Sequence, residues 1–250
     1  MLDKTTSLYV ISFAALFLAA CGSPRLTETS SRVASGGEQF FHTMEIAAGI
    51  RQALEIGITD GANALSAPNG YMDSPYRILL PPEAQAVADR LQPLPGFSRV
   101  ESILTERLNR AAEAAASHAT PIFKQAIRNM SIRDAMSILM GENDAATQYL
   151  RAVAYDQLYE EFSPVIIASL DKVHARTYWS EIATAYNRLP IEQTANPHLD
   201  DYVTHAALDG LFAMVANKEH EIRTDVNARS TALLRRVFAR QDATTSTPTD

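Results

Sequence analysis

The sequence predicts an all-α fold, a helical bundle of about eight helices, and three observations support it. Apolar residues recur at the spacing of an α-helix through most of the 250 residues. Strand signals are scarce, and at most one short extended segment or hairpin is expected, between Tyr76 and Leu80. The links between the predicted helices are short, and no repeat of solenoid length is present. Residues 39–240 are therefore expected to form a single helical domain.

Apolar periodicity places the helices along this domain. The first carries Ile46, Ile50, Leu54 and Ile58, which step by four along one face. The others are expected, in chain order, at about residues 98–115, from residue 120 onward, and at 131–140, 143–162, 165–176, 178–189, 199–223 and 226–238.

Single residues mark some of the helix ends. Ser131 and Asp134 have the spacing of a capping box, and Gly141 follows as a stop signal. Pro164 lacks a backbone N–H, so it is expected to break or kink the helix at 143–162. Gly210 lies in mid-helix, where glycine costs about 1 kcal/mol against alanine. We expect it to permit close approach by another helix.

Composition and charge exclude several classes of protein. The chain has 22 Lys plus Arg, 29 Asp plus Glu and a net charge of −7, without a long basic run. It is therefore a poor candidate for binding nucleic acid through the phosphate backbone. A single cysteine rules out a disulfide framework.

The first twenty residues read as an export signal. Lys4 precedes an apolar run of eleven residues from Leu8 to Leu18, and small residues follow. Such a run covers about half of the roughly 30 Å hydrocarbon core of a bilayer, so it is too short for a stable span. Residues 1–20 are predicted to be a lipoprotein signal peptide, removed on export.

The end of this signal resembles the lipobox of bacterial lipoproteins, in the order Leu18-Ala19-Ala20-Cys21-Gly22. The resemblance implies cleavage before Cys21, a diacylglycerol on its sulfur and acylation of the new amine. Several acyl chains would hold the protein stably on a membrane. Gly22 in place of aspartate implies sorting to the outer membrane, with the domain facing the periplasm. The alternative is a core cysteine behind an ordinary cleavage site.

Both ends of the mature chain are poor in apolar residues. Residues 21–38 are expected to be a flexible tether from the lipidated Cys21, and residues 241–250 a disordered tail.

The sequence contains no standard catalytic motif, phosphate-binding glycine loop or paired-cysteine metal spacing. No catalytic residue, cofactor or metal is predicted. Asp201, His205 and Asp209 share one helix face and could bind a divalent metal, but a salt-bridged helix surface is the commoner arrangement.

Polar side chains embedded in alanine-rich helical segments form a candidate ligand site or a structural network. Structural networks are the commoner outcome. The residues of this set are Asn109, Arg110, Glu113, Asp144, Thr147, Arg151 and Arg223, with Glu219, Asp225 and Arg229 nearby in sequence.

Several blocks, in order, resemble the bacterial lipoprotein family known as domain of unknown function 4197. The resemblance covers roughly residues 46–238, with Leu150 and Val226 as departures. It implies an exported, helical lipoprotein with no established activity, substrate or cofactor. The blocks are Asn109-Arg110-Ala111-Ala112-Glu113, Asp134-Ala135 with Ile138-Leu139 and Gly141, Asp144-Ala145-Ala146-Thr147 with Tyr149, Tyr202-Val203-Thr204, Ala207-Leu208-Asp209-Gly210-Leu211-Phe212, and Ile222-Arg223 with Arg229.

Three functions fit these features. The first is a non-enzymatic binding or interaction module, anchored to the membrane through Cys21, whose partner is a small polar ligand or an envelope protein. The second is an envelope hydrolase that uses Glu113 and Asp144 as acid and base. The third is a purely structural envelope protein with a closed polar network.

Overall fold

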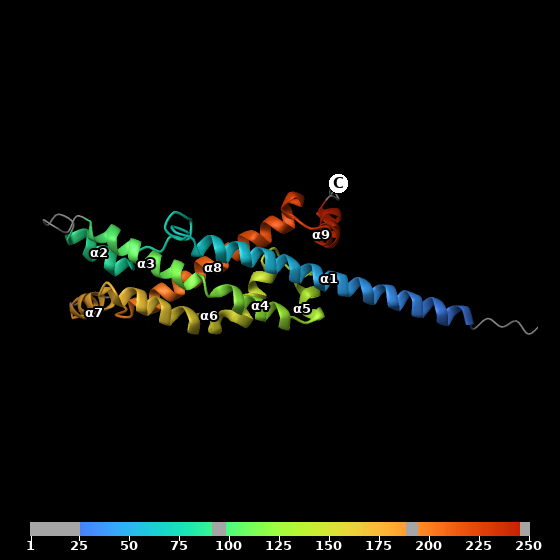
Figure 1. Ribbon diagram of the computed structural model, residues 1–250, viewed down its shortest axis with the longest axis horizontal. Coiled ribbons are helices and arrows are strands. Elements are labelled where there is room, and N and C mark those ends of the chain that lie inside the picture. Colours follow the sequence, from blue (N-terminus) through green and yellow to red (C-terminus); the bar gives the residue numbers. More distant parts are fainter. Residues whose placement is uncertain (1–25, 92–98, 189–194, 246–250) are drawn as a thin grey trace, which may run out of the picture. The chain divides into compact units, whose positions relative to one another are not determined.

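The computed structural model describes residues 26–91, 99–188 and 195–245, and these ranges contain nine α-helices and no strand (Figure 1). The prediction of an all-α bundle is confirmed. In chain order the elements are α1 (Leu26–Ser66), α2 (Pro82–Leu91), α3 (Val100–Ala116), α4 (Ala119–Asn129), α5 (Ile132–Met140), α6 (Ala145–Asp171), α7 (Ala175–Tyr186), α8 (Leu199–Thr224), a 3-10 turn (Val226–Ala228) and α9 (Ala232–Thr245).

The chain divides into two compact units, Met1–Phe40 and Phe41–Asp250. In the first, the structure describes the opening residues of α1. The second contains the rest of α1 and every other helix. Among the described residues, no helix has the length and apolar content needed to cross a membrane.

Helix α6 is the centre of the second unit and packs against α3, α4, α5, α7 and α8. It buries every fourth residue, from Ala146 through Leu150, Ala154, Leu158, Phe162 and Ile166 to Leu170. A step of four advances about 40° beyond a full turn, so this stripe winds around the helix. The winding stripe explains how one helix can contact five others in succession.

Pro164 neither ends α6 nor divides it in two, so of the predicted break or kink at this residue the break is absent. The side chain of Pro164 is exposed, and the carbonyl of Glu160 that loses its N–H partner belongs to another exposed residue, one turn earlier. Phe162 and Ile166 continue the buried stripe on both sides of the proline. Their packing holds the helix together across the missing hydrogen bond.

Helix α1 packs closely on α8 and α9 through glycines. A Cβ atom on Gly49 would lie 2.6 Å from Cγ2 of Val237, and one on Gly61 would lie 3.0 Å from the side chain of Met214. Contacts this short leave room only for hydrogen, so these positions allow α1 to approach its neighbours.

Two chain segments differ from the sequence prediction. Helix α1 begins at Leu26, inside the range 21–38 predicted to be a flexible tether, and α9 continues to Thr245, inside the predicted tail. Adding one residue to an existing helix fixes only that residue for each new hydrogen bond, so a packed helix can extend into polar sequence. Cys21 and residues 246–250 lie outside the described part.

Helix α2 was not predicted, although Pro82 at its first position and Glu83 in its first turn are both typical of a helix start. Between Tyr76 and Leu80 the backbone is a turn followed by irregular chain, so the predicted extended segment has no strand partner. The capping box is confirmed: Ser131 Oγ accepts from the Asp134 N–H at 3.1 Å, and Asp134 accepts from the Ser131 N–H at 2.9 Å. The Ser131 hydroxyl also donates to the Asp134 carboxylate at 2.7 Å, and this bond, followed by the one from the Ser131 N–H, lowers the pKa of Asp134.

Candidate functional site

The seven candidate polar residues do not line one cavity. The structure distributes six of them over three places: the middle of α3, the junction of α5, α6 and α8, and an exposed seam between α6 and α8. Asp144 joins none of these networks. It precedes α6 without capping it, is exposed, and hydrogen-bonds to Gln148 at 3.0 Å.

On α3, the fully buried Asn109 takes the place of a strand partner for Ile78. Its Oδ1 accepts from the Ile78 N–H and its Nδ2 donates to the Ile78 carbonyl, both at 2.8 Å. Nδ2 also donates to the carbonyl of Thr105 at 2.7 Å. Because all these groups are buried, the bonds satisfy polar atoms that would otherwise be costly. Asn109 therefore fixes the segment near Ile78 on α3.

One turn further along α3, Glu113 is 5% exposed and pairs with the more exposed Arg110 at 2.8 Å. Arg110 also donates to Asn69 at 2.7 Å; Asn69 has a positive φ of 66°. Burial, and then the charge of Glu113, raise the pKa of Tyr71, whose hydroxyl donates to the Ala207 carbonyl at 2.7 Å. Together, these contacts attach the loop before residue 78 to α3 and α8.

Gly210 serves the same loop. A Cβ atom there would lie 2.9 Å from the ring of Tyr71 and 3.1 Å from Cβ of Tyr76. The expected close approach at Gly210 is therefore present, but its partner is this loop and not another helix.

At the second place, Glu219 of α8 caps the start of α6. Its Oε1 accepts from the Ala146 N–H at 2.9 Å, and its Oε2 accepts from both the N–H and the hydroxyl of Thr147 at 2.8 Å. The first N–H groups of a helix have no partner within it, and the helix dipole favours a negative charge at this end. Glu219 thus fills the role that Asp144 leaves open.

Arg223 lies one turn after Glu219 and completes the end of α5. It donates to Glu219 Oε1 at 2.8 and 3.0 Å, and to the carbonyl of Ile138 at 2.8 Å. Both charged side chains are less than a tenth exposed. A guanidinium at the carbonyl end of α5 and a carboxylate at the N–H end of α6 each match the local helix dipole.

Arg229 caps a third helix end. Its side chain is 1% exposed and donates to the carbonyls of Ile222 and Arg223, at the end of α8, both at 2.9 Å. Its guanidinium also lies 5.7 Å from the ring centre of Phe238 on α9. Three helix ends, of α5, α6 and α8, are therefore closed by charged side chains of α8 and the residues that follow it.

Beside the Glu219–Arg223 pair lies a mainly apolar cleft, lined by residues such as Leu54, Ile58 and Val215. Its free volume is about 30 Å³. This is room for only one or two water molecules. The buried pair therefore works as a structural junction and does not line a ligand-sized cavity.

The third place is the exposed seam between α6 and α8. Arg151 pairs with Asp209 at 3.0 Å and lies 4.7 Å from the ring centre of Phe212. A second chain of contacts joins Tyr155 to His205 at 2.6 Å and His205 to Asp201 at 3.3 Å.

Tyr159 completes this seam by donating to Asp201 at 2.6 Å. That hydrogen bond, followed by burial, raises the pKa of Tyr159 to about 12. Asp201, His205 and Asp209 thus bind tyrosines and an arginine of α6. Among the described residues, no cluster of three or more His, Cys, Asp or Glu side chains could hold a metal ion.

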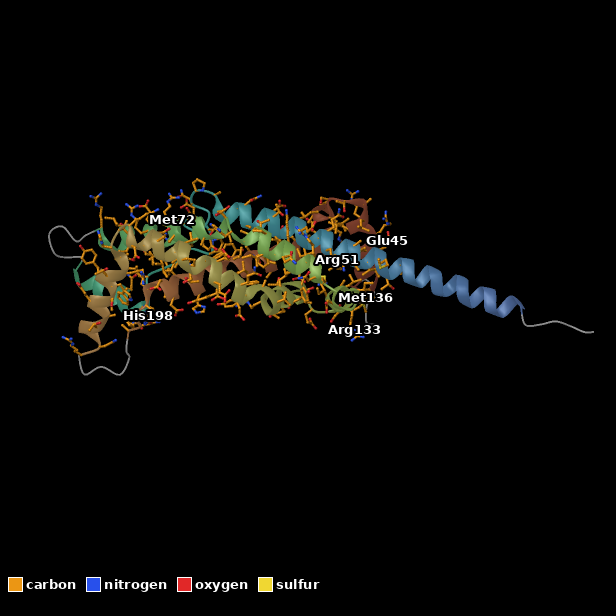
Figure 2. All side chains as sticks on the ribbon, turned by 60° about the horizontal axis from the view of Figure 1, so that its bottom comes forward. Glu45, Arg51, Met72, Arg133, Met136 and His198 are labelled. Carbon is orange, nitrogen blue, oxygen red and sulfur yellow. The ribbon has the colours of Figure 1, made fainter. Side chains whose placement is uncertain are left out.

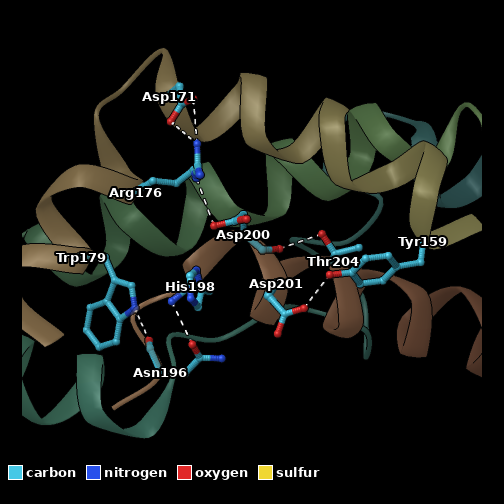
Figure 3. A network of polar contacts seen from close by, with 9 residues as sticks. All are labelled: Tyr159, Asp171, Arg176, Trp179, Asn196, His198, Asp200, Asp201 and Thr204. Atoms are coloured by element: carbon cyan, nitrogen blue, oxygen red, sulfur yellow. Dashed lines mark hydrogen bonds and ion pairs between the residues drawn. The ribbon is translucent and has the colours of Figure 1, made fainter. Parts of the chain in front are cut away.

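The seam continues toward α7 through residues that the sequence analysis did not select (Figure 3). Arg176 bridges Asp171 at the end of α6 and Asp200 at the start of α8, at 2.9 and 3.1 Å. Trp179 donates to the carbonyl of Asn196 at 2.8 Å. The short spacing of Asp171 and Arg176 along the chain favours an ion pair between them. The contact of Arg176 with Asp200 has no such local signal, because Asp200 is distant from it in the sequence.

Residues 41–239 match a family described as protein of unknown function (DUF4197). The chain belongs to this family. The match covers most of the protein, and its first residue is the first residue of the second compact unit. The predicted family is therefore confirmed, and the matched range runs here from within α1 to within α9. Cys21 lies outside the matched range. No curated protein and no solved structure matches the chain.

Proposed function

We propose that this DUF4197 protein is a lipoprotein of the bacterial outer membrane whose helical domain faces the periplasm and serves as a binding or interaction module without enzymatic activity. The segment from Leu18 to Gly22, with Cys21 as the only cysteine of the chain, is the observation that carries the proposal. The proposed anchor is lipid on Cys21, and the proposed partner is an envelope protein or a small polar ligand.

The contacts of Glu113 and Asp144 support a binding module over a hydrolase. Glu113 lies beside Tyr71, whose hydroxyl reaches Ala207, whereas Asp144 stands at the helix start that Glu219 caps. From residue 207 to residue 219 is a length of α8 of about 18 Å. Acid–base pairs of glycoside hydrolases, for comparison, are roughly 5–10 Å apart.

The lipid anchor is tested by the mass of the protein purified from membranes. We expect the chain to begin at Cys21 and to carry a diacylglycerol and an amide-linked acyl chain. The variant Cys21→Ala should carry neither of these lipid groups and should retain its uncleaved signal peptide. A wild-type chain that is cut elsewhere and leaves the membrane in salt-free buffer would overturn the proposal.

The site of anchoring is tested by separating inner and outer membranes on a density gradient. The wild-type protein should fractionate with the outer membrane, because Gly22 follows the lipidated cysteine. The variant Gly22→Asp keeps the lipid and should move to the inner membrane. If both proteins fractionate with the inner membrane, the proposed location is wrong.

A further inference from the structure

A hollow of about 400 Å³ lies between the early part of α1 and the middle of α9. This volume is within the range of small-molecule sites, roughly 300–1,000 Å³. The hollow is lined by His42, Glu45 and Ile46 from α1 and by Arg236, Val237 and Ala239 from α9. Figure 2 labels Glu45, which marks its position on α1. None of these residues belongs to the polar networks described above.

The walls of the hollow are apolar and firmly held. Ile46 and Val237 are 5% and 4% exposed. Gly49, one turn along from Glu45, meets Val237 so closely that even a methyl group would not fit. This contact fixes α9 against α1, so the hollow belongs to a packed interface and needs no rearrangement to form.

The rim carries a guanidinium with spare donors. Arg236 binds Glu45 Oε1 through Nε and Nη2, both at 2.7 Å. A guanidinium has five N–H donors, so the others can bind a further acceptor. The side chain of Arg236 is 62% exposed, which leaves it accessible to a ligand.

His42 supplies an unused polar atom. Its Nε2 is buried, yet it has no hydrogen-bond partner among the described residues. Buried polar atoms in folded proteins nearly always have a partner, and an orphan of this kind calls for a ligand or a water. His42 also lines the hollow, so a rotation of its ring would bring Nε2 to a ligand there.

The local charge favours an anion. Helix α9 carries three arginines and one aspartate, in a chain whose net charge is −7. Glu45 of α1 pairs with one of the three, Arg236. The helix therefore keeps a small excess of positive charge in an otherwise acidic protein, which favours negative over positive groups near the hollow.

We propose that this hollow binds a small anionic amphiphile, with its carboxylate or phosphate on Arg236 and His42 and its alkyl chain against Ile46, Val237 and Ala239. Free fatty acids and single-chain phospholipids share this chemistry. The site is independent of lipid on Cys21, so failure of either proposal leaves the other standing.

The test uses isothermal titration calorimetry on residues 22–250, with decanoate as the probe below the concentration at which it forms micelles. Decyltrimethylammonium has the same chain and the opposite charge, and decyl phosphate has a phosphate head. We expect saturable binding of decanoate, at least about tenfold tighter than binding of the cation, since a charge-assisted hydrogen bond is worth that much. Tighter binding of decyl phosphate than of decanoate would indicate a phospholipid as the natural ligand.

Two variants make the test specific. Arg236→Gln should weaken decanoate about tenfold, and Ala239→Trp should abolish binding by filling the hollow from an exposed position. Arg107→Gln, an exposed arginine of α3, is the matched control and should bind as the wild type does. Circular dichroism checks that each variant is folded. Three results would overturn the proposal: the cation binds as tightly as decanoate, both hollow variants bind decanoate as tightly as the wild type, or decanoate shows no saturable binding.

Discussion

Glu219 and Arg223 stand one turn apart on α8, and each completes the end of a different helix. Their mutual ion pair alone would be weak evidence for stability, because burying two charges is costly. Their hydrogen bonds to backbone groups of α5 and α6 make the pair stabilising, since those groups have no partner within their own helices. The pair thus defines how three helices meet.

Removing Arg223 should therefore be far more damaging than removing a surface charge. Arg223→Ala leaves Glu219 buried without its cation and Ile138 without its donor, and we expect a loss of about 3 kcal/mol in the free energy of unfolding. Lys218→Ala removes a partly exposed pair with Glu221 on the same helix and should cost less than about 1 kcal/mol. Urea denaturation measures both. If both variants lose the same free energy of unfolding, the junction does not contribute more to stability than a surface ion pair.

Tyr71 should make the stability of the protein depend on pH in the alkaline range. Its pKa in the folded protein is raised above the unfolded value of about 10, so the stabilisation is complete below pH 10 and is lost as pH rises. We expect a loss of about 1.4 kcal/mol per pH unit from this residue. Tyr71→Phe should cost about 1 kcal/mol at pH 7, through the bond to Ala207, and should flatten the decline above pH 10. Parallel stability curves for the two proteins would contradict this.

At the scale of elements, α6 shows how packing can override a local break signal. Its apolar stripe runs on past Pro164, and the lost hydrogen bond lies on the exposed side. Local sequence alone favours a break at this residue, and the neighbouring helices favour continuity.

Pro164→Ala should accordingly stabilise the protein. The change restores an N–H for the carbonyl of Glu160 and removes the ring from the helix interior, which is worth up to about 3 kcal/mol. Thermal denaturation should show a higher midpoint. Glu160→Ala, an exposed change one turn earlier, serves as the control and should shift the free energy of unfolding by less than about 0.5 kcal/mol. A destabilised Pro164→Ala variant would show that α6 needs the proline.

The glycines of α1 give a second prediction at this scale. Gly49→Ala places a methyl group 2.6 Å from Val237 and should destabilise the protein by about 1–3 kcal/mol. At Gly57 the nearest atom, Cβ of Lys218, is 3.4 Å away. Gly57→Ala should therefore gain about 0.5–1 kcal/mol from helix propensity. Chemical denaturation of both variants checks the opposite signs, and a loss at both positions would show that α1 needs glycine for another reason.

For the whole molecule, the family match and the division of the chain agree on where the folded unit begins. Both place its start at residue 41. Residues 26–40 extend α1 beyond this point.

We therefore expect residues 41–250 to fold without the preceding segment. Their thermal midpoint and the steepness of their urea transition should equal those of residues 22–250, because the slope follows the surface exposed on unfolding. A lower midpoint together with a shallower slope in the shorter chain would show that residues 22–40 belong to the core.

The sequence by itself determined the helical class, the family, the apolar face of α1 and the Ser131–Asp134 capping box. The helical class, the apolar face of α1 and the capping box depend on residues a few positions apart, so periodicity and local spacing reveal them. The family followed from the resemblance of several blocks in order. The tertiary structure decided what the polar residues do. Glu219 caps a helix that begins 74 residues earlier in the chain, and Asn109 binds a segment 31 residues away. Such contacts depend on which helices pack together, and that is settled by the shape and burial of whole faces.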